Sequence, residues 1–354
     1  MLSFSPAQPG LGSAGLAVLI TGIGYIGARL SEMLLDAGET VVGLDNFFST
    51  SLSAIQKLSA NPHFLFVEGD VAKEADVERA FRLGGRVEVV YHLAAQSSSH
   101  PSAAPIRYTE ETNLIGPRVV VEQACAAGVR LFVFGGSIQV YGRRVEGSID
   151  EQTPYGPIAD ISHLSKLYVE KLMEMYAHNR GLRCLSARLG LVYGVGPVMK
   201  SDPRFMTAPN LFCKLAADGE SLRLSPTAFY PTSVVHLDDV CRGLLALATW
   251  DRSGYSPVHL LGATISVADI AMVVQRIAAE RGLKVSVLTP DQRPSPVACS
   301  FRSVLTDMGF APRIPLEQGL REVIDHFASG HRGGRSEARE ESPPDSPRTE
   351  GSRP

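Results

Sequence analysis

Two short stretches of the chain carry side chains that could move a proton. Ser137 closes an apolar, strand-like run, and the segment SHLSKLYVEKL further on places Ser162, Ser165, Lys166 and Glu170 near the start of a helical pattern. A hydroxyl and an amine held at neighbouring strand ends can exchange a proton with a reacting oxygen. Each residue alone is more typical of a helix cap or a solvated charge, so the elements around them must decide.

A glycine-rich turn near the N-terminus supplies the second half of such a site. Residues 21–27 read TGIGYIG and lie between the apolar run 16–20 and an amphipathic helical pattern at 25–35, and Asp45 ends the next apolar run. This order is typical of a dinucleotide site, where glycines permit a tight turn close to a pyrophosphate at a helix N-terminus. Asp45 can accept from both ribose hydroxyls and would repel a 2′-phosphate, so the sequence predicts NAD rather than NADP.

Alternating elements predict the scaffold that positions these residues. Strand-like runs at 63–70, 88–94, 130–137 and 182–192 are separated by helical patterns near 51–60, 73–83, 104–127 and 162–179. Such alternation predicts an α/β fold with a Rossmann-type doubly wound parallel sheet. Beyond residue 194, prolines interrupt the pattern, and helices near 209–218, 238–250, 266–281 and 316–328 alternate with short strands.

These patterns predict four regions. Residues 1–14 form a flexible lead, and 15–194 a NAD-binding domain to which some later segments return. Residues 195–328 are mainly a smaller C-terminal α/β substrate domain. Residues 329–354, rich in Gly, Ser, Pro, Arg and Glu, are too poor in apolar side chains to offset their ordering entropy, which predicts a disordered tail.

Composition excludes several classes of protein. A net charge of −3 gives no reason to expect a nucleic acid or membrane partner. No apolar run has the length of a membrane span, and the N-terminal residues lack the basic region of a signal peptide. Five scattered cysteines favour a cytoplasmic protein without a disulfide framework.

Taken together, the motifs resemble the extended short-chain dehydrogenases/reductases, and specifically the NAD-dependent epimerase/dehydratase group of nucleotide-sugar enzymes. The resemblance runs from about residue 16 to residue 327. It is carried by TGIGYIG, LDN (44–46), EGDV (68–71), HLAAQ (92–96), Asn113, FVFGGSIQVYG (132–142), Ser165, Lys166, Glu170, VVHLDDV (234–240) and the segment 293–320.

The resemblance implies a role for each matching position, with NAD as the cofactor and a small sugar or nucleotide-sugar as the substrate. Residues implied to contact NAD are Gly22, Gly24, Tyr25, Ile26 and Gly27 at the pyrophosphate, Asp45 and Asn46 at the adenosine ribose, Asp70 and Val71 at the adenine, Leu93, Ala94 and Ala95 toward the nicotinamide, and Lys166 at the nicotinamide ribose. Ser137 would hydrogen-bond the reacting oxygen, and Ser97 and Arg293 would contact substrate. The resemblance also implies structural roles for His236, Asp238 and Asp239, with Asp238 or Asp239 as a helix cap, so we expect no metal.

One departure from the family affects the chemistry. The family's proton donor and acceptor is a tyrosine four residues before the lysine, and this chain has Ser162 there. A lysine and a cationic cofactor can lower the pKa of a tyrosine toward neutrality, whereas an aliphatic hydroxyl titrates far higher. Either another group, His163 or Tyr155, supplies the base, or the chemistry is altered, or the protein binds NAD without turning it over.

Other departures narrow the reaction. Ile138 and Gln139 replace the acid pair of 4,6-dehydratases, which argues against the usual dehydratase mechanism. Leu191 and Thr232 replace residues that help hold a substrate diphosphate, and the glycine loop is one residue shorter than usual.

The resemblance therefore implies an epimerase/dehydratase-like enzyme that oxidises a sugar hydroxyl transiently and returns the hydride, an isomerase or lyase rather than a net oxidoreductase. Ser137 and Lys166 would act at its centre, with His163 or a water held by Ser162 in a non-standard proton relay. The alternatives are a catalytically impaired NAD-binding or regulatory protein and a simple NAD-dependent oxidoreductase. The family also commonly dimerises through the helices expected near 104–127 and 162–179, so a homodimer is an open expectation.

Overall fold

A seven-stranded parallel sheet forms the centre of the protein. The computed structural model describes residues 16–337 apart from 99 and 101, so the predicted lead and residues 338–354 of the predicted tail lie outside it. The strand order is β3-β2-β1-β4-β5-β7-β11, and every neighbouring pair is parallel. The strands are β1 (Leu16–Thr21), β2 (Thr40–Asp45), β3 (Phe64–Glu68), β4 (Arg86–His92), β5 (Leu131–Ser137), β7 (Cys184–Leu189) and β11 (Tyr255–Leu260). The predicted Rossmann-type doubly wound sheet is confirmed.

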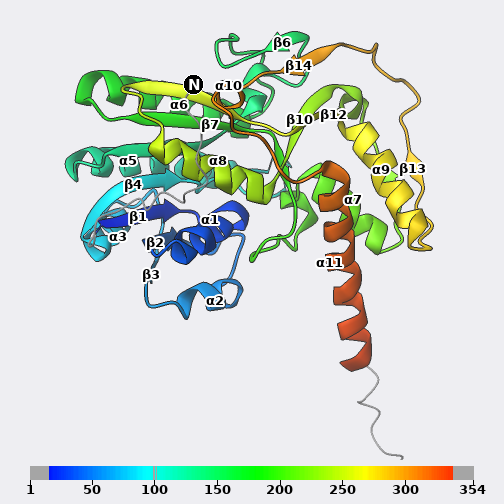
Figure 1. The fold of residues 1–354 in the computed structure, drawn as a ribbon, viewed down its shortest axis with the longest axis horizontal. Helices are drawn as coiled ribbons and strands as arrows, with labels where there is room; N and C mark the ends of the chain where they lie inside the picture. The colour runs from blue at the N-terminus through cyan, green and yellow to red at the C-terminus, as the bar shows by residue number, and fades with distance from the viewer. Residues whose placement is uncertain (1–15, 99, 101, 338–354) are drawn as a thin grey trace, which may run out of the picture.

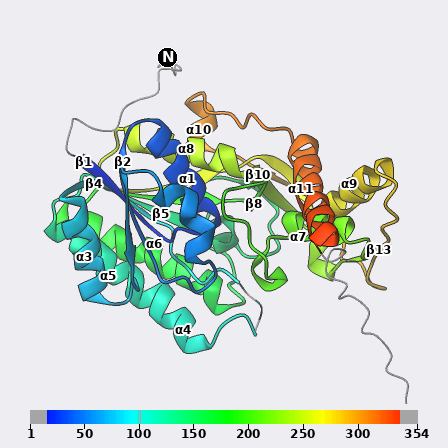
Figure 2. The same ribbon diagram turned by 90° about the horizontal axis from the view of Figure 1, so that it is seen from below.

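Helices cover both faces of this sheet, which explains why its strands are almost continuously apolar. Figure 2 shows α1 (Tyr25–Asp36) and α8 (Leu237–Thr249) on one side, with α3 (Glu74–Gly84), α5 (Gly116–Ala126) and α6 (Ile161–Arg180) on the other. Two separate clusters of buried apolar side chains fill the space between sheet and helices. A short helix, α2 (Gln56–Ser59), follows β2, and α4 (Ile106–Glu110) leads through one π-helical turn into α5.

A smaller lobe lies beside the carboxyl ends of the central strands (Figure 1). Its three-stranded sheet has the order β12-β10-β8, and its helices pack around a third apolar cluster. These elements are β8 (Leu191–Tyr193), β10 (Pro231–His236), β12 (Ala263–Ser266), α7 (Ala208–Ala217), α9 (Val267–Glu280) and α11 (Leu316–Glu337). Two short ladders join β6 (Gly147–Ile149) to β14 (Cys299–Phe301) and β9 (Leu222–Arg223) to β13 (Val287–Leu288), and α10 (Val304–Asp307) follows β14.

The chain crosses between the two lobes more than once. Although α8 and β11 come late in the sequence, β11 is an edge strand of the central sheet and α8 covers one face of that sheet, whereas β8 pairs with β10 in the smaller lobe. His236 caps the first turn of α8 by accepting from the Asp238 amide, and Asp239 accepts from the amides of Arg313 and Ile314. The prediction that Asp238 or Asp239 caps this helix is therefore wrong. The cap is His236, because its ring and not an aspartate carboxylate accepts from the free amide of Asp238.

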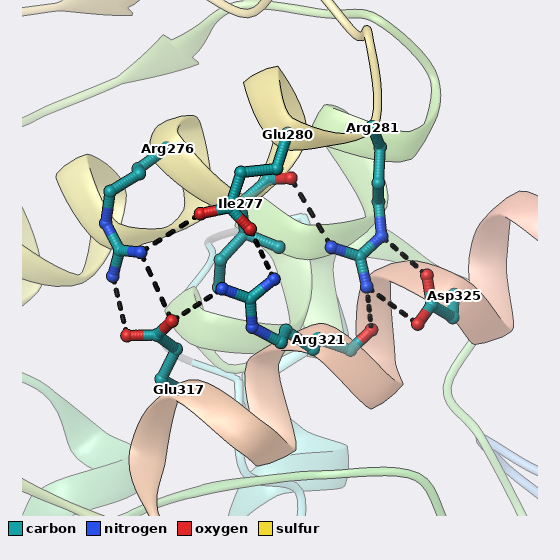
Figure 3. Close-up of polar contacts among 7 residues, drawn as sticks. All are labelled: Arg276, Ile277, Glu280, Arg281, Glu317, Arg321 and Asp325. Carbon is teal, nitrogen blue, oxygen red and sulfur yellow. Dashed lines mark hydrogen bonds and ion pairs between the residues drawn. The ribbon is translucent and has the colours of Figure 1, made fainter.

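A row of ion pairs fixes α11 to α9 (Figure 3). Arg321 pairs with Glu280 and Glu317, and Arg276 also contacts Glu317. Arg281 forms two contacts with Asp325.

The end of α11 corrects a predicted boundary. The helix continues to Glu337, beyond the point at residue 329 where the sequence predicted a disordered tail, and Figure 1 shows it extending past the neighbouring helices. Once the first turns are held by packing, each further residue adds a backbone hydrogen bond without a new nucleation cost. Composition alone does not reveal that advantage.

Candidate active site

A cavity of about 300 Å³ opens at the carboxyl ends of the central strands. Residues from the glycine turn, from the ends of β2, β4 and β5, and from the first turn of α6 line it. Of the residues predicted from sequence, the lining contains Gly22, Gly24, Tyr25, Ile26, Gly27, Asp45, Asn46, Val71, Leu93, Ala94, Ala95, Ser97, Ser137, Ser162, His163 and Lys166. Residues far apart in the chain thus meet at the edge where ligands bind in open α/β sheets.

Two of the three glycines in the glycine turn have surroundings that exclude a side chain. Gly22 adopts φ +84°, and a Cβ there would lie 2.5 Å from the Ala94 amide nitrogen. A Cβ on Gly27 would lie 2.0 Å from the Gly22 carbonyl oxygen, so this position admits no side chain. Gly24, the N-cap of α1, has only Thr50 within 4 Å of its added Cβ, at 3.8 Å. The helix N-terminus therefore faces open space, which suits a pyrophosphate despite the shortened turn.

The acidic residue at the end of β2 is held beside this turn. The Asp45 carboxylate accepts from the Ile23 and Phe47 amides, each at 2.7 Å, and burial raises its pKa despite these bonds. Oδ1 also accepts from the Thr50 hydroxyl at 3.4 Å, whereas Oδ2 keeps a lone pair for a ribose hydroxyl. Asn46 lies next to it and donates to the Tyr108 hydroxyl at 3.1 Å.

Asp70, predicted beside an adenine, lies just outside the cavity lining. Its carboxylate accepts from the Ala72 amide at 2.9 Å, while its neighbours Gly69 and Val71 do line the cavity. The strand end is placed as expected, but the Asp70 carboxylate is engaged by its own turn and, at 3.4 Å, by the Asn46 side-chain amide.

Lys166 reaches across the cavity from α6 to β5. Its ammonium donates to the Gly135 carbonyl at 2.9 Å and lies 4.8 Å from the centre of the Phe134 ring. Burial lowers the pKa of Lys166 to about 8, and Lys200 adds to that effect.

Ser137 begins the short 3₁₀ turn after β5, where its hydroxyl accepts from the Gln139 amide at 3.1 Å. The predicted hydroxyl and amine thus line the same cavity.

Ser162, at the position of the family tyrosine, is almost fully buried. Its side chain is 3% exposed, and its hydroxyl donates to the Gln96 carbonyl at 3.4 Å. A short hydroxyl engaged in this way is no base at neutral pH.

His163 is paired with the residue that caps its own helix. The Asp160 carboxylate accepts from the His163 amide at 2.9 Å, and its second oxygen lies 2.6 Å from the ring Nδ1. A carboxylate at Nδ1 favours the proton there and leaves Nε2 as an acceptor. Burial lowers the pKa of His163 and Asp160 partly opposes it, so the ring is neutral at pH 7. His163 therefore has the protonation state that a general base needs.

Tyr155 belongs to a buried cluster outside the cavity lining. Its hydroxyl donates to Glu170 at 2.9 Å, and burial raises its pKa to about 12. Glu170 also receives two hydrogen bonds from Arg188, at 2.7 and 2.9 Å, and one from Ser186. Of the two candidate bases, the structure places only His163 in the cavity.

Arg293, the second predicted substrate contact, also lies away from the cavity. It is exposed on the segment between β13 and β14, with its guanidinium 5.1 Å from the centre of the Phe229 ring. The resemblance identified Arg293 by its position in the sequence, but it could not predict that the backbone of this segment runs away from the cavity.

Sequence reasoning missed Lys200, which lies on the segment between β8 and α7 and lines the cavity. Its ammonium lies 3.3 Å from the Ser97 hydroxyl, and burial lowers its pKa to about 8. Phe205 of the same segment lines the cavity and meets Phe48 edge-on, and Phe48 in turn stacks on Tyr108 at 3.9 Å. The segment has no periodic pattern, so only its single lysine could have drawn attention.

Together, the parallel sheet, the glycine turn, the acidic strand end and the lysine define a dinucleotide-binding protein of the Rossmann class. Residues 18–261, more than half of the chain, match the NAD dependent epimerase/dehydratase family, and the chain belongs to that family. Its cofactor is NAD.

Curated relatives are similar along most of the chain. UDP-glucuronic acid decarboxylase 1 of Xenopus tropicalis is 27% identical over 319 residues, which cover 88% of this chain and 72% of that protein. UDP-glucuronate 4-epimerase 4 of Arabidopsis thaliana is 26% identical over 358 residues, which cover 92% and 78%.

Solved structures share the fold over nearly their whole length. The UDP-glucose 4-epimerase of Thermotoga maritima, solved with UDP-glucose, has a TM-score of 0.76 at 26% identity and covers 89% of this chain and 99% of its own. The UDP-glucose 4-epimerase of Thermus thermophilus, solved with NAD, has a TM-score of 0.73 at 28% identity, with coverage of 88% and 98%. Within residues 16–337, gaps at 99 and 101 excepted, no helix combines the length and apolarity needed to cross a bilayer.

Proposed function

We propose that this protein interconverts or decarboxylates a UDP-sugar by transient oxidation, with a proton relay through His163 in place of the family tyrosine. The observation that carries the proposal is that Ser137, His163 and Lys166 line the same cavity as the glycine turn and Asp45. We infer a UDP-sugar as the substrate from the relatives, whose names give UDP-glucuronate or UDP-glucose as what they act on.

The residues proposed to hold NAD follow from the shape and charge of the cavity. The amides at the start of α1 would bind the pyrophosphate, Asp45 the adenosine ribose, and Lys166 the nicotinamide ribose. The apolar wall of Leu93 and Ala94 would exclude water beside the ring. When bound, NAD accepts a hydride from a sugar carbon and later returns it.

The chain's own residues would handle the proton. His163 Nε2 would remove it from the sugar hydroxyl while the Ser137 hydroxyl donates to the oxygen that becomes a carbonyl. The oxygen would give its proton to His163 while the carbon would give a hydride to NAD, so the sugar would be oxidised by two electrons. Return of both regenerates the alcohol. Lys166 would orient the cofactor, and a water held by Ser162 could link His163 to an oxygen that it does not reach directly.

The charge of the cavity favours an acidic sugar. Lys166 and Lys200 both line it, and Lys200 lies within hydrogen-bonding distance of Ser97, a predicted substrate contact. An ammonium at that place would pair with a substrate carboxylate. We therefore propose a UDP-hexuronate as the preferred substrate. Oxidation beside its carboxylate-bearing carbon yields a β-keto acid, which either loses carbon dioxide or is reduced on the other face.

A label experiment tests the proposal. The purified protein is incubated with sub-stoichiometric NAD and UDP-glucuronate carrying deuterium at the sugar carbon to be oxidised, and the products are followed by NMR. The expected result is many turnovers per NAD, with the deuterium retained and no accumulation of reduced cofactor. UDP-glucose is the matched neutral substrate. Stoichiometric reduced NAD would instead show a simple oxidoreductase, and bound NAD without turnover of either sugar would show a binding protein.

A Lys200→Gln variant is expected to raise KM for UDP-glucuronate by roughly tenfold at pH 7, because a hydrogen bond to a charged group contributes about 1.5 kcal/mol or more. kcat should change little. In the wild type, KM should rise as the pH passes about 8, since Lys200 loses its charge there. That rise should flatten in the variant. Equal effects of the substitution on UDP-glucose and UDP-glucuronate would contradict the pairing with the carboxylate.

Exposed apolar side chains support the proposed homodimer. On α4, the π turn after it and α6, Ile106, Ile115, Leu164, Tyr168 and Met175 are 37–66% exposed. Clusters of this kind mark interaction surfaces. A Leu164→Glu variant is expected to convert a dimer into a monomer in light scattering after size exclusion. Met272→Glu, at a similarly exposed position on α9, should leave the mass unchanged.

A further inference from the structure

A line of arginines follows the amino edge of the central sheet, opposite the edge that carries the active-site cavity. Arg86 is the first residue of β4, and Arg130 and Arg183 directly precede β5 and β7. Arg252 lies three residues before β11. Because these four strands are neighbours in the order β11-β7-β5-β4, the arginines fall side by side although they are far apart in sequence.

Three of these arginines line an open pocket of about 560 Å³. Arg130, Arg183 and Arg252 meet there with backbone and small side chains from the ends of α6 and α8, and the remaining lining residues are Gly181, Ala248, Thr249, Asp251, Ser253 and Gly254. Asp251 is the carboxylate of this lining. The size is within the range of pockets that hold small molecules.

The partners of the three guanidinium groups differ. Arg130 contacts Glu88 at 2.5 Å and donates to the Ala248 carbonyl at 3.2 Å, so it is largely neutralised and ties β5 to α8. Arg252 lies 5.1 Å from the centre of the Trp250 ring and is otherwise exposed. Arg183 has no acceptor among the described residues for Nε or Nη2, and both nitrogens are buried.

Arg183 is therefore a half-buried cation whose charge the described protein does not neutralise. Burial and repulsion by Arg130 lower its pKa, and attraction by Asp251 only partly opposes them. A buried N–H group without an acceptor lowers stability. Arg130 has an ordinary structural role, since it donates to a carbonyl at the end of α8. No such bond accounts for the buried nitrogens of Arg183.

We propose that this pocket is a second binding site, for a small phosphate-bearing anion held by Arg183, Arg252 and the free edge of Arg130. Guanidinium groups match phosphate oxygens in pairs. Because Glu88 already pairs with Arg130, the charges of Arg183 and Arg252 face the single carboxylate of Asp251, and the net positive charge that remains favours an anion. Because Nε and Nη2 of Arg183 are buried, the side chain would have to turn for these nitrogens to contact the ligand. The proposal is independent of the reaction at the opposite edge.

Calorimetric titration of the full chain, saturated with NAD and UDP so that the active-site cavity is filled, tests the site. The probes are inorganic phosphate and pyrophosphate at constant ionic strength, with citrate as the carboxylate comparison. The expected result is one saturable site for a phosphate probe, weakened at least tenfold in Arg183→Gln and in Arg252→Gln. Arg223→Gln, at an exposed position on β9, is the matched control and should bind like the wild type.

Each other outcome overturns the proposal. No saturable binding to the wild type, or unchanged binding in Arg183→Gln, would show that the pocket is not a phosphate site. Tighter binding of citrate would assign the pocket to carboxylates instead. If Arg183→Gln fails to fold, Arg252→Gln decides, because that side chain is exposed and its loss should not affect folding.

Discussion

Replacing His163 with glutamine is expected to lower kcat by roughly 10²–10⁴-fold, the usual contribution of a general base. NAD affinity should be unchanged, because the ring is paired with Asp160 on its own helix rather than with the glycine turn. Single-turnover and steady-state rates on the same substrate give the measurement. His178→Gln, in the last turn of the same helix, is the matched control.

The pH profile separates a base from a residue that only shapes the helix. Since burial lowers the pKa of His163, the acid limb of kcat should fall below the ordinary histidine value of 6.5. An Asp160→Asn variant keeps an N-cap for α6 but removes the charge that opposes this lowering. Its acid limb should move to still lower pH, and kcat should fall because the ring tautomer is no longer fixed. An unchanged kcat in His163→Gln would show that His163 is not the base, and the proton would then be assigned to a water at Ser162.

Replacing Gly27 with alanine is expected to weaken NAD binding by roughly a hundredfold. The new Cβ would lie 2.0 Å from the Gly22 carbonyl oxygen, so the turn must open or α1 must shift away from β1. Overpacking of this kind also costs about 1–3 kcal/mol in the free energy of unfolding. Calorimetric titration with NAD and thermal unfolding measure the two effects separately.

Gly38→Ala is the control for this second prediction. Gly38 follows α1 with φ +83° and nothing within 4 Å of an added Cβ, so alanine there strains the backbone without touching the turn. It should lower stability and leave NAD affinity intact. If both variants bind NAD like the wild type, the glycine turn is not the pyrophosphate site.

The sequence predicted the elements with a strong period and the residues tied to them. Apolar runs such as LAVLIT and LFVFGGS are buried parallel strands because helices cover both faces of the sheet. Ser137 and Lys166 then reach one cavity because the strands are parallel and α6 returns along β5.

Residues on irregular segments were beyond such reasoning. Lys200 reaches the cavity and Arg293 does not, yet both lie where no periodicity constrains the backbone. Tyr155 was a reasonable base by residue type, but its hydroxyl is held by Glu170, a contact between a loop and a helix that sequence spacing does not reveal. The ladders β6–β14 and β9–β13 are two or three residues long and equally without a pattern.

The buried pair of Glu170 and Arg188 has a consequence for how this enzyme could change. The two side chains are 0% and 2% exposed and fasten α6 to β7 without lining the cavity. Ser162, His163 and Lys166 lie in the first two turns of α6, on the N-terminal side of this pair. In this helix, the side chains that face the cavity and the pair that anchors the helix are thus different residues. We therefore expect designed replacements at positions 162 and 163 to exchange one acid–base group for another without loosening this anchor.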